Sequence, residues 1–169
     1  MATSKAYVAS GTVLTIDGTA GADYAFSMEG VTNAAGRVSA QVDLGVAPRE
    51  GVYSWSCEVQ FQATPTQYAT LDLYIAKAPD SDATQIDGDV GNADAALGDI
   101  DMRSNLQYIG SVVSENAAAS EKCVASGEFT CYDRYISIVG YNESGATINA
   151  TDSNFLFELT PKSWQGQAT

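Results

Sequence analysis

The side chains best suited to do chemistry in this chain are aspartates that gather in one segment. Residues 78–102 hold seven aspartates and no lysine or arginine. Among them, Asp87, Asp89 and Asp94 alternate with glycines and an asparagine, the kind of oxygen-rich loop that can wrap Ca²⁺. An EF-hand is excluded, because the glycine is misplaced and no glutamate closes the loop. We therefore expect a solvated acidic loop, with a calcium site at these three aspartates as the alternative.

Catalytic motifs are missing from the rest of the sequence. The chain has no histidine, which removes Ser-His-Asp and Cys-His catalysis and histidine metal ligands. It has no phosphate-binding glycine motif, and its cysteines lack the C-x-x-C spacing of zinc sites. Any acidic β protein offers carboxylate pairs for glycoside hydrolysis, and no pair stands out here. We predict that the protein is not an enzyme and needs no cofactor.

The cysteines do not form the pattern of a disulfide-stabilised domain. Cys57, Cys123 and Cys131 are odd in number and widely spaced, whereas disulfide frameworks use even, denser sets. Cys57 falls on the apolar face of a predicted strand, where a free cysteine acts as a small core residue. The sequence leaves a Cys123–Cys131 disulfide open.

Two aromatic residues lie outside the strand pattern, close to the ends of the chain. Tyr7 and Trp164 belong to segments 1–8 and 162–169, which flank the predicted strands. Aromatic side chains can stack on sugars or anchor protein interfaces. For Trp164 the alternatives are packing over the end of the fold and anchoring an interface. We take both residues as interface candidates and the two segments as candidate assembly arms.

Short β-strands separated by Gly, Asn, Asp and Ser turns account for most of the chain. Residues 51–62 alternate between polar and apolar, and the apolar members share one face: Tyr53, Trp55, Cys57, Val59 and Phe61. A helical period would spread these side chains around the whole helix, so a strand is favoured. Residues 68–76 show the same alternation, and 124–131 and 134–141 are predicted to be neighbouring strands.

About eight to ten such strands are typical of an all-β protein. They predict an antiparallel β-sandwich with jelly-roll-like character, interrupted by the long acidic loop. A length of 169 residues favours a single domain that spans residues 1–169.

Charge and hydropathy exclude several classes of partner. The net charge is −13, and the eight basic residues are scattered singly, so no basic stripe exists to bind nucleic acid. An acidic membrane surface would repel the chain, and no apolar run is long enough to span a membrane. Residues 1–5 are not followed by the apolar stretch of a secretory signal. We expect synthesis in a cytoplasm without export.

The order of segments in the C-terminal two thirds resembles a known class of protein. An aliphatic strand at 71–76 precedes the Asp/Gly-rich loop, and the segments that follow are Leu106-Gln107-Tyr108-Ile109-Gly110-Ser111-Val112, Arg134-Tyr135-Ile136-Ser137-Ile138-Val139, Tyr141-Asn142-Glu143-Ser144-Gly145 and Phe155 to Pro161. Residues 50–161 thereby resemble the small virion structural proteins of tailed bacteriophages that decorate or cement the capsid. The resemblance implies a β-sandwich or jelly roll that oligomerises on the shell, commonly as a trimer, and that has no catalytic residues.

Three functions follow as hypotheses. The first is a non-enzymatic phage decoration or cement protein, made in the host cytoplasm and placed on the capsid surface of the virion. It would bind the major capsid protein as a homo-oligomer, with no nucleic-acid or membrane partner. The second is a receptor-binding or carbohydrate-binding β-sandwich module on a phage fibre, which would present an exposed aromatic platform. The third is a structural protein of the phage neck or tail.

Overall fold

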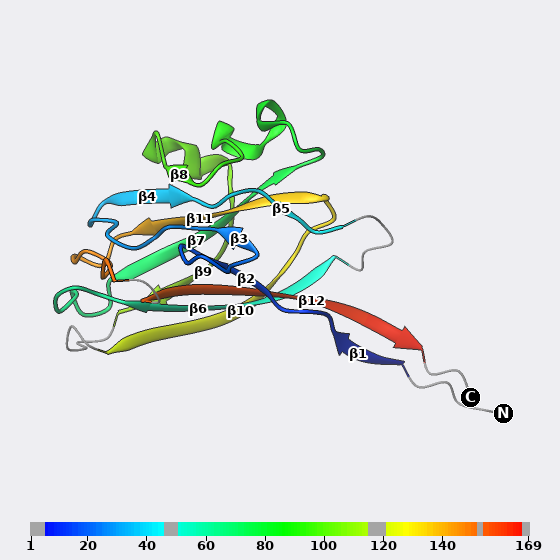
Figure 1. The fold of residues 1–169 in the computed structure, drawn as a ribbon, viewed down its shortest axis with the longest axis horizontal. Helices are drawn as coiled ribbons and strands as arrows, with labels where there is room; N and C mark the ends of the chain where they lie inside the picture. The colour runs from blue at the N-terminus through cyan, green and yellow to red at the C-terminus, as the bar shows by residue number, and fades with distance from the viewer. Residues whose placement is uncertain (1–5, 46–50, 115–120, 152–153, 167–169) are drawn as a thin grey trace.

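The computed structural model describes residues 6–45, 51–114, 121–151 and 154–166, and they form two β-sheets packed face to face (Figure 1). Each sheet has six strands, and every paired strand is antiparallel to its neighbour except the short β2–β3 pair. The expectation of an all-β, antiparallel sandwich is therefore confirmed.

The first sheet, sheet A, has the strand order β10-β6-β12-β2-β3, and β1 pairs with the far end of β12. Its strands are β1 (Ala6–Ser10), β2 (Leu14–Asp17), β3 (Tyr24–Ala25), β6 (Val52–Gln60), β10 (Lys122–Thr130) and β12 (Phe155–Gly166). The second, sheet B, has the order β8-β4-β11-β7-β9, and β5 pairs with β11. Its strands are β4 (Ala35–Val38), β5 (Val42–Asp43), β7 (Thr70–Ala78), β8 (Ala95–Ala96), β9 (Gln107–Val113) and β11 (Tyr135–Asn142).

The core lies between the two sheets and is built from the alternating residues of their longest strands. The predicted apolar face of β6 is buried, with each of its side chains at most 4% exposed. Further fully buried residues come from β7 and β11 of the facing sheet and from β12, which pairs with β6: Leu71, Leu73, Ile75, Ile136, Ile138, Phe155, Phe157 and Leu159. Full burial of one such side chain contributes about 1.5–3 kcal/mol, so these faces hold the sandwich closed.

Trp55 of β6 fits into this core because the residues packed against its ring from two other strands are glycines. Its indole stacks on Phe157 at a ring-centroid distance of 6.0 Å. A Cβ on Gly127 of β10 would lie 2.9 Å from the indole, and one on Gly110 of β9 would lie 2.6 Å from it. Gly110 also has a φ of +148°, which a side chain would strain. The two strands thus leave room for Trp55 from opposite sheets.

We predict that Gly127→Ala lowers the free energy of unfolding by about 1–3 kcal/mol, because the added methyl group meets a buried ring that cannot turn away. Ser126→Ala, at the exposed neighbouring position, should change it by less than about 0.5 kcal/mol. Chemical denaturation of both variants measures the difference. Equal losses would mean that the indole shifts freely, contrary to this packing.

One sequence-based prediction about strand neighbours is wrong. The segments 124–131 and 134–141 correspond to β10 and β11, but these strands lie in different sheets. β10 pairs with β6 along its whole length, whereas β11 pairs with β7, β4 and β5. The short connection between them crosses the sandwich. Apolar alternation shows which residues face a core, but it does not tell which sheet a strand joins.

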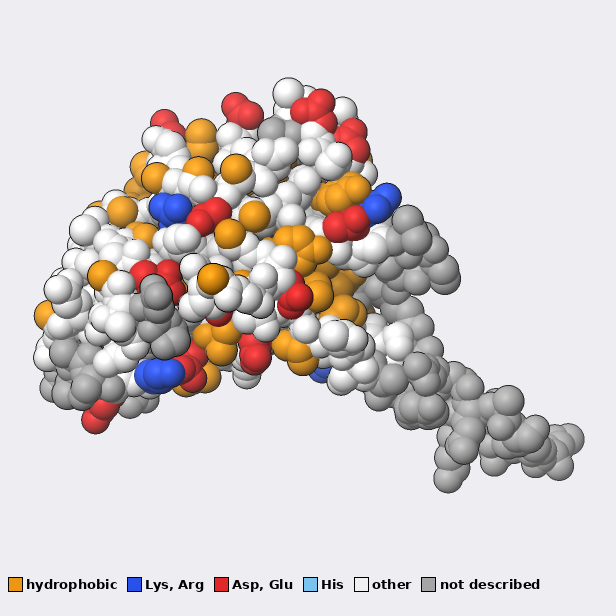
Figure 2. Space-filling view, in the orientation of Figure 1, with side chains coloured by type: hydrophobic (Ala, Val, Ile, Leu, Met, Phe, Trp, Pro, Cys, Tyr) orange, Lys and Arg blue, Asp and Glu red, His pale blue; other side chains and the backbone are white. Residues whose placement is uncertain are grey.

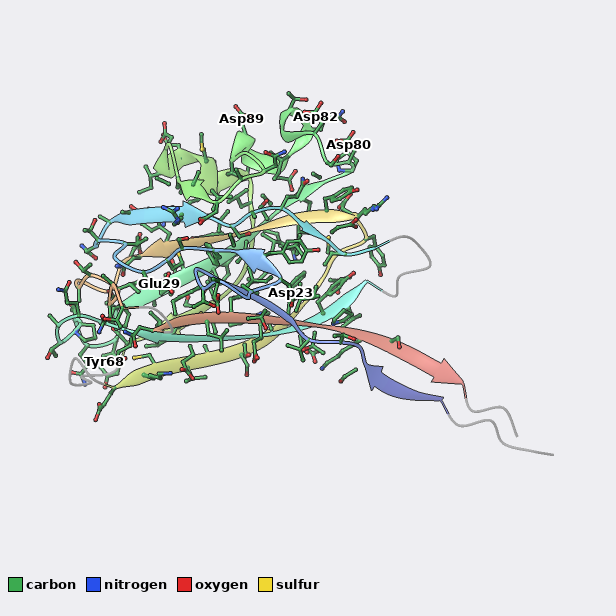
Figure 3. All side chains as sticks on the ribbon, in the orientation of Figure 1. Asp23, Glu29, Tyr68, Asp80, Asp82 and Asp89 are labelled. Atoms are coloured by element: carbon green, nitrogen blue, oxygen red, sulfur yellow. The ribbon has the colours of Figure 1, made fainter. Side chains whose placement is uncertain are left out.

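The acidic segment is a folded cover on sheet B. Residues 79–106, here called the insertion, lie between β7 and β9 and contain three short 3₁₀ helices, η1 (Ala83–Gln85), η2 (Asp87–Asp89) and η3 (Ile100–Asn105). Ile86 is buried against Ala76 and Ala78 on the outer face of β7. Carboxylates gather on the outside of the insertion (Figure 2), where Asp80, Asp82 and Asp89 point away from the sheets (Figure 3). Among the described residues, no helix has the length and apolar character to cross a membrane.

Candidate functional site

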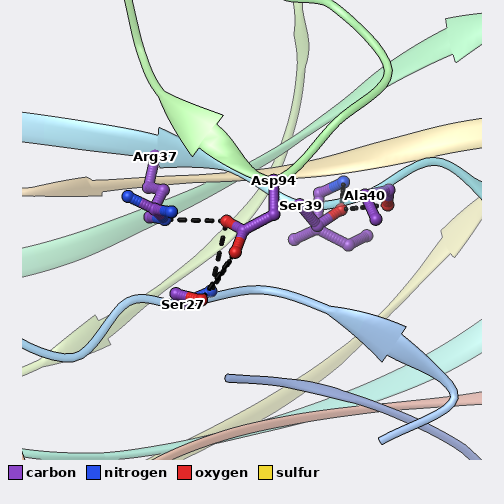
Figure 4. A network of polar contacts seen from close by, with 6 residues as sticks. Ser27, Arg37, Ser39, Ala40 and Asp94 are labelled. Atoms are coloured by element: carbon purple, nitrogen blue, oxygen red, sulfur yellow. Dashed lines mark hydrogen bonds and ion pairs between the residues drawn. The ribbon is translucent and has the colours of Figure 1, made fainter. Parts of the chain in front are cut away.

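Asp94, one of the three calcium candidates, holds the insertion to the sandwich. Its Oδ1 accepts a hydrogen bond from Arg37 Nε at 2.7 Å, and its Oδ2 accepts one from Ser27 Oγ at 2.5 Å (Figure 4). Burial by itself raises the pKa of Asp94, but the hydrogen bonds from Arg37 and Ser27 outweigh it and hold this pKa below its usual value. The carboxylate therefore stays charged and acts as a structural link between β4 and the insertion.

The other two candidates do not join Asp94. Asp87 Oδ2 accepts a hydrogen bond from the backbone N–H of Lys77 at 3.2 Å, which ties η2 to β7. Asp89 is exposed and has a left-handed backbone, with a φ of 53°. Within the described part of the chain, no three Asp, Glu or Cys side chains are grouped as a metal site requires. Hydrogen bonds within the protein shape this loop.

We predict that Asp94→Asn lowers the free energy of unfolding by about 1–2 kcal/mol near neutral pH, because a charge-assisted pair to Arg37 is lost. The native pKa of Asp94 lies below its ordinary value of 3.8, so this stabilisation is present above that value and is lost as the pH falls through the native pKa. The difference between variant and wild type should shrink in strong acid. Urea denaturation as a function of pH measures it.

The matched control for this prediction is Asp89→Asn, because asparagine also tolerates the left-handed backbone found there. It should change the free energy of unfolding by less than about 0.5 kcal/mol. A loss at Asp89 as large as that at Asp94 would contradict a specific role for the Arg37–Asp94 pair.

We also predict that calcium leaves the melting temperature of the wild-type protein unchanged, because Asp94 is already bound by Arg37 and Ser27. A cation held in the native state would raise the melting temperature by mass action. Thermal denaturation with and without about 1 mM CaCl₂, a concentration that would saturate a sensor-type site, tests this. A rise that a chelator reverses would establish a calcium site in this loop.

The interface candidates Tyr7 and Trp164 lie in a two-stranded ribbon. β12 pairs with β6 only as far as Lys162, and residues 163–166 pair only with β1. Tyr7 is opposite Gln165, and Trp164 is opposite Val8. The ribbon projects from one end of the sandwich (Figure 1). The structure brings the backbones of Tyr7 and Trp164 together in this ribbon. Their side chains lie outside the described residues, so their role at an interface stays a prediction.

This ribbon has open edges. Among the described residues, no further strand pairs with β1 or with residues 163–166. A two-stranded ribbon is marginally stable in water by itself. Its outer edges carry backbone N–H and C=O groups that can pair with another chain. The projecting ribbon is therefore a candidate surface for assembly.

A cleft lies where the insertion meets the outer face of sheet B. It has a volume of about 340 Å³ and is lined by Tyr74 of β7 and by Ile100, Asp101, Arg103 and Ser104 of η3. Tyr108 of β9 stands beside Tyr74, opposite it in the strand register, with ring centroids 5.4 Å apart. Tyr108 is 54% exposed. The cleft thus has one tyrosine ring in its wall and a second, exposed ring beside it, together with groups that donate and accept hydrogen bonds.

Polar contacts fix Arg103 in the cleft wall and the Tyr108 ring beside the cleft. Arg103 Nη1 donates to Glu143 Oε1 at 3.1 Å, and its guanidinium lies 3.8 Å above the Tyr141 ring. Tyr108 Oη contacts Ser111 Oγ, which donates to Asp72 Oδ1 at 2.8 Å. Because the Ser111 proton goes to Asp72, the Tyr108 hydroxyl is the donor in the first contact. Both the arginine and the exposed ring are therefore held in place.

The tyrosine in the cleft wall keeps its proton. The pKa of Tyr74 is raised, first by burial and then by the nearby carboxylate of Asp72, although Arg103 opposes the shift. Sequence reasoning did not single out Tyr74, Tyr108 or Arg103. The signal for Tyr74 was its polar-face position between Leu73 and Ile75. The position of Arg103 against β11 follows from tertiary structure alone.

The Cys123–Cys131 disulfide that the sequence left open does not form. The two residues lie eight positions apart along and just beyond β10, which at the rise of a β-strand places them roughly 26 Å from each other. A disulfide requires Cα atoms within about 7 Å. Cys57 is fully buried, as predicted for a core residue, and burial raises the pKa of its thiol.

Comparison with known proteins gives little. No family model and no curated protein matches the chain. A solved structure described as the EclA C-terminal domain, a sugar-binding protein, shares 12% identity and a TM-score of 0.34, covering 98% of this chain and 80% of that one. A TM-score this low carries no argument about fold or function.

Proposed function

We propose that this chain is a non-enzymatic structural protein of a phage virion that binds the major capsid protein as an oligomer and stabilises the shell. The observation that carries the proposal is the ribbon formed by β1 and the end of β12, which projects from the sandwich with open edges. The resemblance of residues 50–161 to phage decoration proteins supports the same role.

The ribbon suits attachment to a protein surface for a physical reason. A projecting pair of strands gains stability when an added strand or a packed surface satisfies its backbone groups and covers its side chains. The energetic gain at each copy can be modest, because a symmetric shell presents many equivalent sites and an oligomer engages several of them together. In this arrangement the ribbon attaches the rigid sandwich to neighbouring protein subunits of the shell.

A fibre, neck or tail position is the alternative to the shell. These positions also suit a stable β-sandwich without catalytic groups, and a projecting ribbon could join copies into a ring. The capsid is preferred because residues 50–161 resemble decoration proteins. The arrangement of copies in intact particles, seen by electron microscopy, distinguishes these positions from one another.

We predict that removing residues 1–9 and 163–169 leaves a folded sandwich that no longer binds capsids. The deletion ends where β12 stops pairing with β6, so it removes the ribbon and leaves the pairing of β12 with β6 and β2 intact. Capsids without the protein would be incubated with wild-type or truncated chain, sedimented, and heated at low salt to measure shell integrity. Wild-type protein should cosediment as an oligomer and delay bursting, whereas the truncated chain should do neither.

The control is Tyr132→Ala, which removes an exposed tyrosine from the sandwich body and should leave cosedimentation unchanged. Circular dichroism establishes that the truncated chain is folded. Cosedimentation of the truncated chain as efficient as that of the wild type would reject the ribbon as the attachment site. Virions that lack the protein but remain robust and fail to adsorb to cells would favour the receptor-binding function.

A further inference from the structure

We infer that the cleft between η3 and the β7–β9 face of sheet B binds a neutral saccharide. This inference rests on the side chains of the cleft and does not depend on the capsid role. The volume of about 340 Å³ is at the lower end of the range for small-molecule sites, which suits a short stretch of a sugar chain.

The charges around the cleft select against charged ligands. Arg103 lies in the wall and opposes an organic cation, although tyrosine rings by themselves would favour one. Asp101 in the wall and Glu143 beside Arg103 oppose a phosphate, a sulfate or an acidic sugar. The net charge of −13 adds to that repulsion. A ligand with no net charge is repelled by none of these groups, and many hydrogen-bonding groups would let it pair with them.

The side chains of the cleft match the two kinds of surface that a sugar ring presents. Ile100 in the wall, which is 46% exposed, and the Tyr108 ring, which stands beside the cleft against Tyr74, offer apolar area for the C–H face of a pyranose. Tyr74 keeps its hydroxyl proton and can both donate and accept. A guanidinium has five N–H groups, and the bonds from Arg103 to Ile100 O and Glu143 Oε1 leave others for sugar hydroxyls. The Asp101 carboxylate can accept.

The cleft is also organised before a ligand arrives. The Glu143 ion pair and the stacking on Tyr141 hold Arg103, while the chain through Ser111 to Asp72 holds the Tyr108 ring. Rigid groups lose less conformational entropy on binding. This matters for sugars, because their hydroxyls gain little when they exchange water for protein.

The test is a titration of the full-length protein with neutral oligosaccharides, namely maltohexaose, cellohexaose and chitohexaose, followed by NMR and calorimetry. Choline chloride and sodium sulfate serve as charged probes. We expect saturable binding of at least one neutral oligosaccharide with a Kd of about 1 mM or lower, and no saturable binding of either charged probe. Tyr108→Ala and Asp101→Asn should each weaken the binding about tenfold or more. Both residues are exposed, so both variants should fold.

The control is Tyr132→Ala, which removes an exposed tyrosine that does not line the cleft and should leave the affinity unchanged. The inference is overturned if no neutral oligosaccharide binds at about 10 mM, if only a charged probe binds, or if binding survives both cleft variants. The chain without the ribbon should retain sugar binding. A failed capsid experiment would therefore leave the saccharide inference standing, and a failed saccharide titration would leave the capsid proposal standing.

Discussion

Burial of the inward faces of β6, β7, β11 and β12 against one another is the interaction on which the other features depend. Trp55 lies at its centre, stacked on Phe157 within sheet A. Such a large ring fits only because β9 and β10 each place a glycine against it. Close packing of this kind leaves little freedom in how the two sheets meet. The positions of the sheet edges, and of everything attached to them, follow from it.

The insertion shows how an acidic segment can be structural. Ala76 and Ala78 make the last part of the outer face of β7 apolar, and Ile86 covers them. The Arg37–Asp94 pair then fastens the far part of the insertion to β4. At the rim of this cover the outer face of sheet B is left partly open, which forms the cleft beside Tyr74. This cleft is the place where we propose that a saccharide binds.

The ribbon and the cleft lie on different parts of the molecule and suit different partners. The ribbon offers backbone edges, which suit another protein chain. The cleft offers fixed rings and polar groups, which suit a small neutral molecule. In the proposed virion role, attachment through the ribbon would occupy one end of the sandwich and would leave the outer face of sheet B open to solvent. The two surfaces could therefore be occupied at the same time.

The sequence by itself determined which residues face the core. The alternation around Trp55 and around Leu73 indicated the buried sides of β6 and β7, because a strand turns successive side chains to opposite faces. The absence of histidine likewise limits the chemistry that is open to this chain, whatever its fold. The same two-residue alternation along β6 predicted that Cys57 faces the core, where it is fully buried.

Tertiary structure alone decided which strands pair and which side chains meet. β10 and β11 are adjacent in sequence but join different sheets, because pairing depends on partners far along the chain. In the sequence Asp94 is a candidate calcium ligand, but in the folded chain it pairs with Arg37, which lies 57 positions away. Arg103 similarly meets Glu143 from 40 residues away. Such long-range contacts leave no local period in the sequence, so only the folded chain reveals the ion pairs, the cleft and the ribbon.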